Sequence, residues 1–265
     1  MTDRYAEFDS LVFDRPAPFV LRVTLSAPER RNALTLKMHE QLENLWRAVD
    51  ADPETRATIV TGAGSAFCAG SSFDDMGEGS ETDAGGTFTR RFASAANLVQ
   101  GLIEARKPII SAINGPAMGA GLAIALLADI SIAAKTAKLM DGHLRIGLLP
   151  GDHAAIIWPL LCGMAKAKYY LMTNASMTGE EAERNNLISL AVDAEELEAR
   201  SIAVASQLAG LAPSALAGTK HVLNHWLRQA RPIFETSLAL EIASMAGDEF
   251  REALAAFTEK RPAKF

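Results

Sequence analysis

The sequence predicts an α/β fold, and three observations carry that prediction. Short apolar strands alternate with amphipathic helices through the first two-thirds of the chain. Beyond Gly151 the pattern becomes helical. Apolar residues make up 49% of the 265 residues and charged residues 22%, a composition typical of a packed globular protein.

The first elements follow from the spacing of apolar residues. Residues 19–25 alternate in the manner of a half-buried strand. Apolar side chains recur at helical spacing over residues 35–50, and Pro53 follows where that helix must end. Residues 57–61 predict a short buried strand, and residues 62–70 a turn punctuated by glycines.

The same alternation continues through the middle of the chain. Residues 77–89 are rich in Gly, Ser, Thr and Asp and predict a loop. A helix is expected from about residue 88 to 105, followed by a strand over residues 108–113. A small-residue helix over 121–127 and a strand over 130–133 complete this part.

The last third carries helix signals. Thr178 and Glu181 have the spacing of a capping box, which marks a helix start. Asn186 can adopt the left-handed conformation that ends such a helix. Three further helices are expected over residues 194–210, 213–228 and 232–246.

Charge and cysteine content exclude several classes of protein. The formal net charge of −6 does not favour a nucleic-acid binder with a broad basic surface. Two cysteines cannot form a disulfide framework, and no Cys/His spacing matches a metal site, so we expect a reducing, cytoplasmic setting. The first residues lack a signal-peptide core, and no apolar run is long enough to span a bilayer, so no membrane partner is expected.

One glycine-rich turn invites comparison with dinucleotide-binding proteins. Gly62 and Gly64 follow a predicted strand, as that motif requires. Phe67 stands where the third glycine should be, and no long amphipathic helix begins there. A Rossmann-type site is therefore not favoured.

A serine hydrolase is also poorly supported. The chain contains no Gly-x-Ser-x-Gly, the sequence of a nucleophile elbow. Ser71 and Ser72 are followed downstream by His143 and Asp152, so a Ser/His/Asp set exists by composition alone. No local pattern indicates an activated serine.

Six short motifs occur in order along nearly the whole chain. They are Asn32-Ala33-Leu34, Gly62-x-Gly64-x-x-Phe67-Cys68-Ala69-Gly70, Lys107-Pro108-Ile109-Ile110-Ser111-Ala112-Ile113-Asn114-Gly115, Ala128-Asp129-Ile130, Gly147-Leu148-Leu149-Pro150-Gly151 and Phe257-Thr258-Glu259-Lys260-Arg261-Pro262. Together they resemble the crotonase superfamily, which contains the enoyl-CoA hydratases and isomerases.

The resemblance implies an architecture and a substrate class. It implies a spiral of ββα repeats with the acyl-CoA site over residues 1–200 and a helical oligomerisation region over residues 201–265. A homotrimer or a dimer of trimers is the implied assembly. The implied substrate is an acyl-CoA thioester, with coenzyme A as part of the substrate and no metal or separate cofactor.

The resemblance also assigns residues. By motif position the backbone N–H groups of Ala69 and Ala120 would form the oxyanion hole, where each donor is worth about 3 kcal/mol in well-studied acyl transfer. Arg30 and Arg31 form a pair that can meet phosphates. The other implied CoA contacts are Ala33, Ala66, Gly70, Ser71, Ser72, Phe73, and Phe257 and Lys260 reaching a neighbouring subunit's nucleotide.

The chain departs from the family at the acid/base positions. Hydratases of this family use two glutamates, because hydration needs a base for water and an acid for the α-carbon. Ala123 and His143 occupy those two positions, and Ser72 replaces another usual acidic residue. The two-glutamate mechanism therefore cannot operate as it does in the type enzymes.

A different acid/base arrangement remains. His143 stands at the second position, Asp152 follows and can orient it, and His153 is the reserve candidate. The main hypothesis is hydratase/isomerase-type chemistry on an acyl-CoA enolate, with His143 as acid/base and Asp152 as its orienting group. A His followed by an Asp also resembles the superfamily members that hydrolyse C–C bonds of β-diketones. A non-catalytic acyl-CoA-binding paralogue is the third hypothesis.

Overall fold

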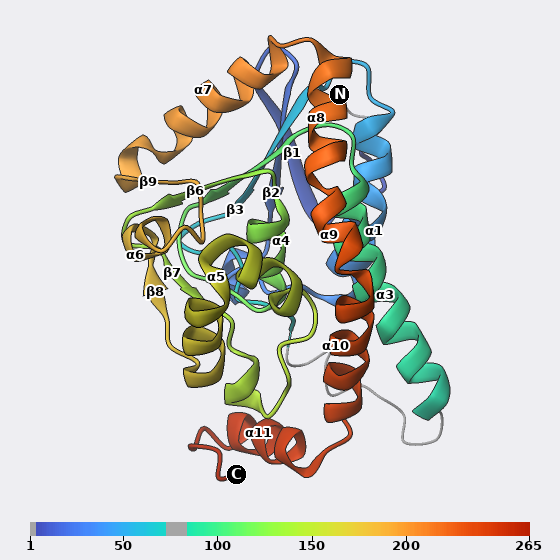
Figure 1. Cartoon of the computed structure of the whole chain (residues 1–265), viewed down its shortest axis with the longest axis vertical. Helices are drawn as coiled ribbons and strands as arrows, with labels where there is room; N and C mark the ends of the chain where they lie inside the picture. Colours follow the sequence, from blue (N-terminus) through green and yellow to red (C-terminus); the bar gives the residue numbers. More distant parts are fainter. Residues whose placement is uncertain (1–3, 73–83) are drawn as a thin grey trace.

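The computed structural model describes residues 4–72 and 84–265 (Figure 1). Phe73 and most of the predicted loop over residues 77–89 lie outside the described residues.

A six-stranded sheet forms the centre of the fold, in the order β1-β2-β3-β4-β6-β9. The first pair is antiparallel and all other neighbours are parallel. The central strand β4 is buried along its whole length, as expected of a parallel strand covered on both faces. The strands are β1 Leu11–Ala17, β2 Val20–Leu25, β3 Ala57–Gly62, β4 Ile109–Ile113, β6 Ile130–Ala134 and β9 Leu190–Val192.

A smaller three-stranded sheet positions the site. It contains β5 Ala117–Met118, β7 Lys138–Met140 and β8 Met177–Thr178, in that order. Strands β5 and β7 run parallel, so the segments that follow them leave the sheet side by side. The N–H of Gly119 accordingly donates to the carbonyl oxygen of Asp141 at 3.0 Å.

Helices cover the main sheet. Helix α1 packs against α3, α7 packs over the strands of the main sheet, and α10 lies against both α3 and α5. In Figure 1, α10 runs along α3 and leads down to α11 at the C-terminal end. The helices are α1 Leu36–Asp50, α3 Ala84–Glu104, α4 Ala120–Leu127, α5 Ala154–Thr173, α6 Gly179–Arg184, α7 Leu197–Ala209, α8 Pro213–Leu223, α9 His225–Gln229, α10 Arg231–Ser244 and α11 Asp248–Thr258. In the described part of the chain, the 3-10 turns are η1 Pro28–Arg30, η2 His143–Ile146 and η3 Ala194–Glu196.

The local signals read from the sequence account for these elements. Thr35 caps α1 by accepting from the Met38 N–H at 3.2 Å. Thr178 and Glu181 form the predicted capping box on α6, and Asn186 has φ 61°. The predicted α/β class and the helical C-terminal part are confirmed.

Several boundaries differ from the prediction. Helix α3 begins at Ala84, within the predicted loop, and the helix expected over residues 213–228 divides at Asn224 into α8 and α9. Strand β1 and helix α11 were not predicted. The expected boundary at residue 200 falls inside α7, which packs on the sheet.

Among the described residues, no helix taken singly has the length and apolar character needed to cross a membrane. One bent pair, Ala194–Ala209 with Pro213–Gln229, meets both criteria when its two halves are counted together.

Candidate active site

The first wall of the site is a short ladder between two loops. Residues 31–34 pair with residues 69–72. The Leu34 N–H donates to the Gly70 carbonyl at 2.8 Å, and the Ser72 N–H donates to the Leu34 carbonyl at 2.9 Å. The Gly70 carbonyl and the Ser72 N–H both bond to Leu34. In a parallel ladder of this kind, the residue between those two groups directs its own N–H away from the 31–34 segment. That residue is Ser71.

This ladder corrects one predicted oxyanion donor. The Ala69 N–H is already engaged, because it donates to the Arg31 carbonyl at 3.0 Å. The Ser71 N–H has no hydrogen-bond partner within the described part of the chain. Ser71 therefore replaces Ala69 as the donor that the geometry leaves available on this wall.

The second wall is the turn that opens α4. Gly119 has φ 49° and ψ −127°, a conformation that glycine adopts readily, and Ala120 is the first residue of the helix. The N–H of a first helical residue has no acceptor within its helix. A Cβ built on Gly119 would lie 3.9 Å from Gly70 Cα and 4.0 Å from His143 Cε1. The two walls and the His143 ring therefore meet at one point.

His143 is held by the turn that follows β7. Gly142 adopts φ 89°, and His143 begins η2. Its Nδ1 lies 2.9 Å from Asp141 Oδ1, and its backbone N–H donates to the same oxygen at 3.2 Å. Because a carboxylate accepts only, Nδ1 carries the proton in this bond. Nε2 is therefore the nitrogen that Asp141 leaves available for other groups.

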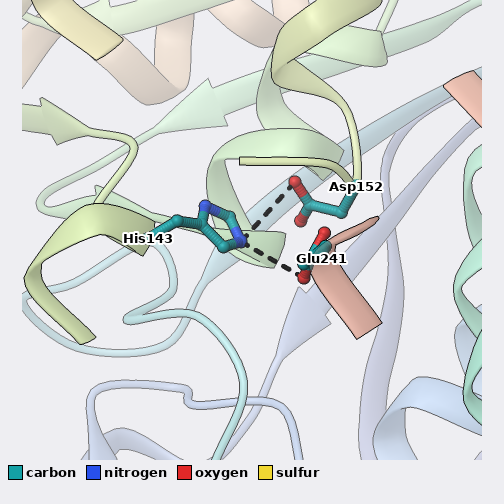
Figure 2. A group of neighbouring side chains, drawn as sticks. All are labelled: His143, Asp152 and Glu241. Atoms are coloured by element: carbon teal, nitrogen blue, oxygen red, sulfur yellow. Dashed lines mark ion pairs between the residues drawn. The ribbon is translucent and has the colours of Figure 1, made fainter. Parts of the chain in front are cut away.

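Two more carboxylates face Nε2 (Figure 2). Asp152 Oδ1 lies 3.8 Å from it, and Glu241 Oε1 lies 3.5 Å from it. His143, Asp152 and Glu241 are 7%, 8% and 6% exposed, so little water screens their charges.

Helix α10 fixes this cluster from a distant part of the chain. Glu241 Oε2 accepts from the Gly151 N–H at 3.1 Å, and Ser237 Oγ donates to the Gly151 carbonyl at 2.8 Å. A Cβ on Gly151 would lie 2.2 Å from the Ser237 carbonyl oxygen, so only glycine permits this approach. Asp152 follows directly and is held on its other side by His153, whose Nδ1 lies 2.6 Å from Oδ1.

The charges in the cluster shift one another's proton affinity. Burial opposes protonation of His143, but the carboxylates of Asp152, Asp141 and Glu241 outweigh it and raise the pKa of His143 well above 6.5. Burial also acts on Asp152, yet His153 and His143 lower the pKa of Asp152. Burial dominates at Glu241 and raises its pKa. The protonation of each of these groups therefore depends on the charge of its neighbours.

The same three side chains have the donor set of a cation site. One ligand atom each from His143, Asp152 and Glu241 lies within 4.8 Å of the others. An imidazole nitrogen and two carboxylate oxygens suit a borderline divalent ion such as Zn²⁺. These three residues could hold such an ion in place of a proton shared among them.

The sequence located part of this site. His143 and Asp152 come together as expected, and Gly119, which precedes Ala120, lies against the His143 ring. Asp141 and Glu241 were missed. The spacing Asp141-Gly142-His143 offered a local signal for Asp141, since a carboxylate two residues before a histidine can reach its ring. Glu241 had no local signal, because helix packing alone brings it to His143.

The predicted CoA residues are distributed over two regions. Arg30 and Arg31 are exposed at the end of η1, beside the ladder. Phe257 lies on α11 and is 58% exposed, and Lys260 follows that helix. Their contact with a neighbouring subunit stays a prediction. The remaining predicted contacts within the described residues, Ala33, Ala66, Gly70, Ser71 and Ser72, lie on the two loops joined by the ladder or on the turn before it.

Comparison with known proteins shows the family. The family model described as enoyl-CoA hydratase/isomerase matches residues 18–265. The probable enoyl-CoA hydratase echA8 of Mycobacterium leprae is 32% identical over 251 residues, 92% of this chain and 93% of that protein. The 1,2-epoxyphenylacetyl-CoA isomerase of Escherichia coli K12 is 32% identical over 254 residues, 93% and 94% of the two chains.

Solved structures share the fold. An enoyl-CoA hydratase/isomerase from Mycobacterium paratuberculosis superposes with a TM-score of 0.86 at 30% identity, covering 93% of this chain and 97% of that one. A second, from Pseudoalteromonas atlantica T6c, gives a TM-score of 0.85 at 28% identity, covering 97% and 99%. The chain therefore belongs to the enoyl-CoA hydratase/isomerase family of the crotonase superfamily.

Proposed function

We propose that this protein moves a proton at the carbon next to the carbonyl of an acyl-CoA thioester, as an isomerase-type enzyme. One observation carries the proposal: the His143 ring lies at the meeting point of the two turns, with its Cε1 4.0 Å from a Cβ built on Gly119, while Asp141 fixes Nδ1 at 2.9 Å. An imidazole held at Nδ1 by one carboxylate, with two more carboxylates near Nε2 to stabilise its charged form, is an arrangement suited to proton transfer.

The oxyanion hole of this proposal consists of two backbone donors. The Ser71 and Ala120 N–H groups would bind the thioester oxygen as it gains charge. Neither donor needs to reorganise, because the ladder fixes one and helix α4 fixes the other. A donor set of this kind stabilises an enolate more than it stabilises the neutral thioester.

His143 performs the proton transfer. Its Nε2 takes the α-proton, and the C–H electron pair moves to the carbonyl oxygen. The same nitrogen then returns the proton to the α-carbon or to the conjugated carbon, so one base suffices for isomerisation. The carboxylates of Asp152 and Glu241 stabilise the imidazolium between the two steps.

Recognition of coenzyme A follows from the same proposal. Arg30 and Arg31 would meet its phosphates, and Phe257 and Lys260 of a neighbouring copy would complete the nucleotide site in a homotrimer or a dimer of trimers. The E. coli relative named as an isomerase of a CoA thioester supports this substrate class.

A second function deserves a test because two carboxylates face Nε2. Asp152 and Glu241 could hold a water molecule against His143. His143 would deprotonate that water, which attacks one carbonyl of a β-diketone. The C–C bond then breaks to give a carboxylic acid and an enolate, and the enolate takes the proton back. This reaction needs no CoA.

Intact-mass measurement separates these functions. Purified protein is incubated in heavy water with a panel of CoA thioesters and, separately, with a cyclic β-diketone, with and without a chelator. Deuterium uptake into a thioester without addition of water supports the proposal, and it should survive the chelator. Mass gain by water would indicate hydration, and cleavage of the diketone would support the second function. CoA binding with neither exchange of a thioester nor cleavage of the diketone would overturn both and indicate a binding paralogue.

A further inference from the structure

Two neighbouring residues hold a backbone conformation that non-glycine residues rarely adopt. Arg31 has φ 53° and Asn32 has φ 56°. Such left-handed conformations persist where surrounding bonds over-determine them, and they gather near functional sites. Asn32 is fully buried, so its side chain is the first candidate for the group that holds this segment.

The Asn32 side chain joins two loops. Its Oδ1 accepts from the Ala27 N–H at 2.9 Å, which closes its own loop. Its Nδ2 donates to the carbonyl oxygens of Ala63 and Ala66 at 2.8 and 2.9 Å, which belong to the turn before residues 69–72. One amide therefore fixes the loop that precedes α1 against the turn that follows β3.

The ladder begins at the residue next to this amide. The Arg31 carbonyl accepts from Ala69, and Leu34 bonds to Gly70 and Ser72. These bonds decide which way the Ser71 N–H points. A shift of the 31–34 segment would rotate that N–H, since the ladder has only these few bonds. The left-handed backbone at Asn32 sets the direction in which the segment enters the ladder.

We infer that Asn32 is a positioning residue for the oxyanion hole. It touches no reacting atom and acts by holding the Ser71 N–H in place through the ladder. The inference rests on the proposed function, because it assumes that Ser71 binds the thioester oxygen.

The matched substitutions are Asn32→Gly and Asn186→Gly. Glycine keeps the left-handed backbone available at Asn32 while removing all side-chain bonds. Asn186 has φ 61° between α6 and β9, so the same change there controls for added backbone freedom away from the site. Asn32→Ser, which retains one short polar group, serves if the glycine variant fails to fold.

The readout is the binding of two CoA derivatives by calorimetry. Acetyl-CoA carries the thioester carbonyl, and S-ethyl-CoA is its thioether and lacks that oxygen. We expect Asn32→Gly to weaken acetyl-CoA binding by about tenfold and to lower kcat more, a smaller effect than deletion of a whole donor. S-ethyl-CoA binding and the Asn186→Gly protein should be unchanged.

The possible results are distinct. The inference is overturned if Asn32→Gly leaves the preference for acetyl-CoA over S-ethyl-CoA unchanged. If both ligands are then weakened equally, Asn32 has a purely structural role. If the wild-type protein itself does not prefer acetyl-CoA over S-ethyl-CoA, the proposed oxyanion hole fails, and the inference fails with it.

Discussion

Replacing Glu241 with glutamine tests the electrostatics of the site. Glutamine has the same shape, and its carbonyl oxygen can still accept from the Gly151 N–H, so the loop before Asp152 stays fixed. The change removes the charge 3.5 Å from His143 Nε2. With an effective dielectric of about 20, a full charge at this distance interacts with an imidazolium by about 5 kcal/mol.

The sign of the effect follows from the charge. Glu241 is one of the carboxylates that raise the pKa of His143, so its loss lowers that pKa. The neutral, basic form of His143 then exists at lower pH. We expect the acid limb of the kcat/KM profile for deuterium exchange to move to lower pH in Glu241→Gln. The plateau should fall, because His143 becomes a weaker base.

The control is Glu235→Gln. Glu235 is a half-buried residue on the same helix and pairs with Arg231 at 2.7 Å. Its profile should match the wild type. An acid limb that stays in place in Glu241→Gln, or moves to higher pH, would refute the role given to Glu241.

Three further predictions concern the groups around this centre. Asp141→Asn should lower kcat by about 10–100-fold with little change in KM, because Nδ1 loses its charged partner; steady-state kinetics would show this, and an unchanged kcat would contradict it. Ala120→Pro removes one proposed donor at a helix position that tolerates proline, so kcat should fall by about 100-fold or more while circular dichroism stays unchanged; wild-type turnover would remove Ala120 from the hole. Asp52 is held by Thr55, Tyr5 and Arg15, and these contacts outweigh burial and lower its pKa from 3.8 to about 2. A depressed carboxyl pKa stabilises the fold above pH 3.8 and loses that effect as pH falls toward 2, so Asp52→Asn should lower the free energy of urea unfolding by about 1–2 kcal/mol near pH 7 and by little near pH 2; an equal loss at both pH values would contradict this account.

The sequence predicted elements where local chemistry decides the structure. The capping pair Thr178 and Glu181, the alternation in β2 and the apolar stripe of α1 each contain their own signal, and each element formed where expected. Helix α3 shows the opposite case. Its first turn is rich in glycine and threonine, which favour a loop, yet the helix begins at Ala84.

The residues of the site also differ in whether a local sequence signal predicts them. His143 and Asp152 lie close in the sequence, so a motif could connect them. Glu241 reaches Nε2 because α10 packs across α5, which no local pattern reports. The exchange of Ala69 for Ser71 depends on which N–H groups bond to the 31–34 segment: the Ala69 N–H bonds to Arg31 and the Ser72 N–H to Leu34, and the Ser71 N–H bonds to neither. The packing of distant segments, and not the local sequence, determines the register of an isolated bridge.

The central claim is that His143 moves the α-proton of an acyl-CoA. The most direct test is the rate of deuterium uptake from heavy water into a thioester that the wild-type protein exchanges, followed by intact mass. His143→Ala is compared with His221→Ala, a change at an exposed histidine on α8. The account predicts a loss of about 100-fold or more for His143→Ala and a wild-type rate for His221→Ala. Exchange at the wild-type rate in His143→Ala would contradict it.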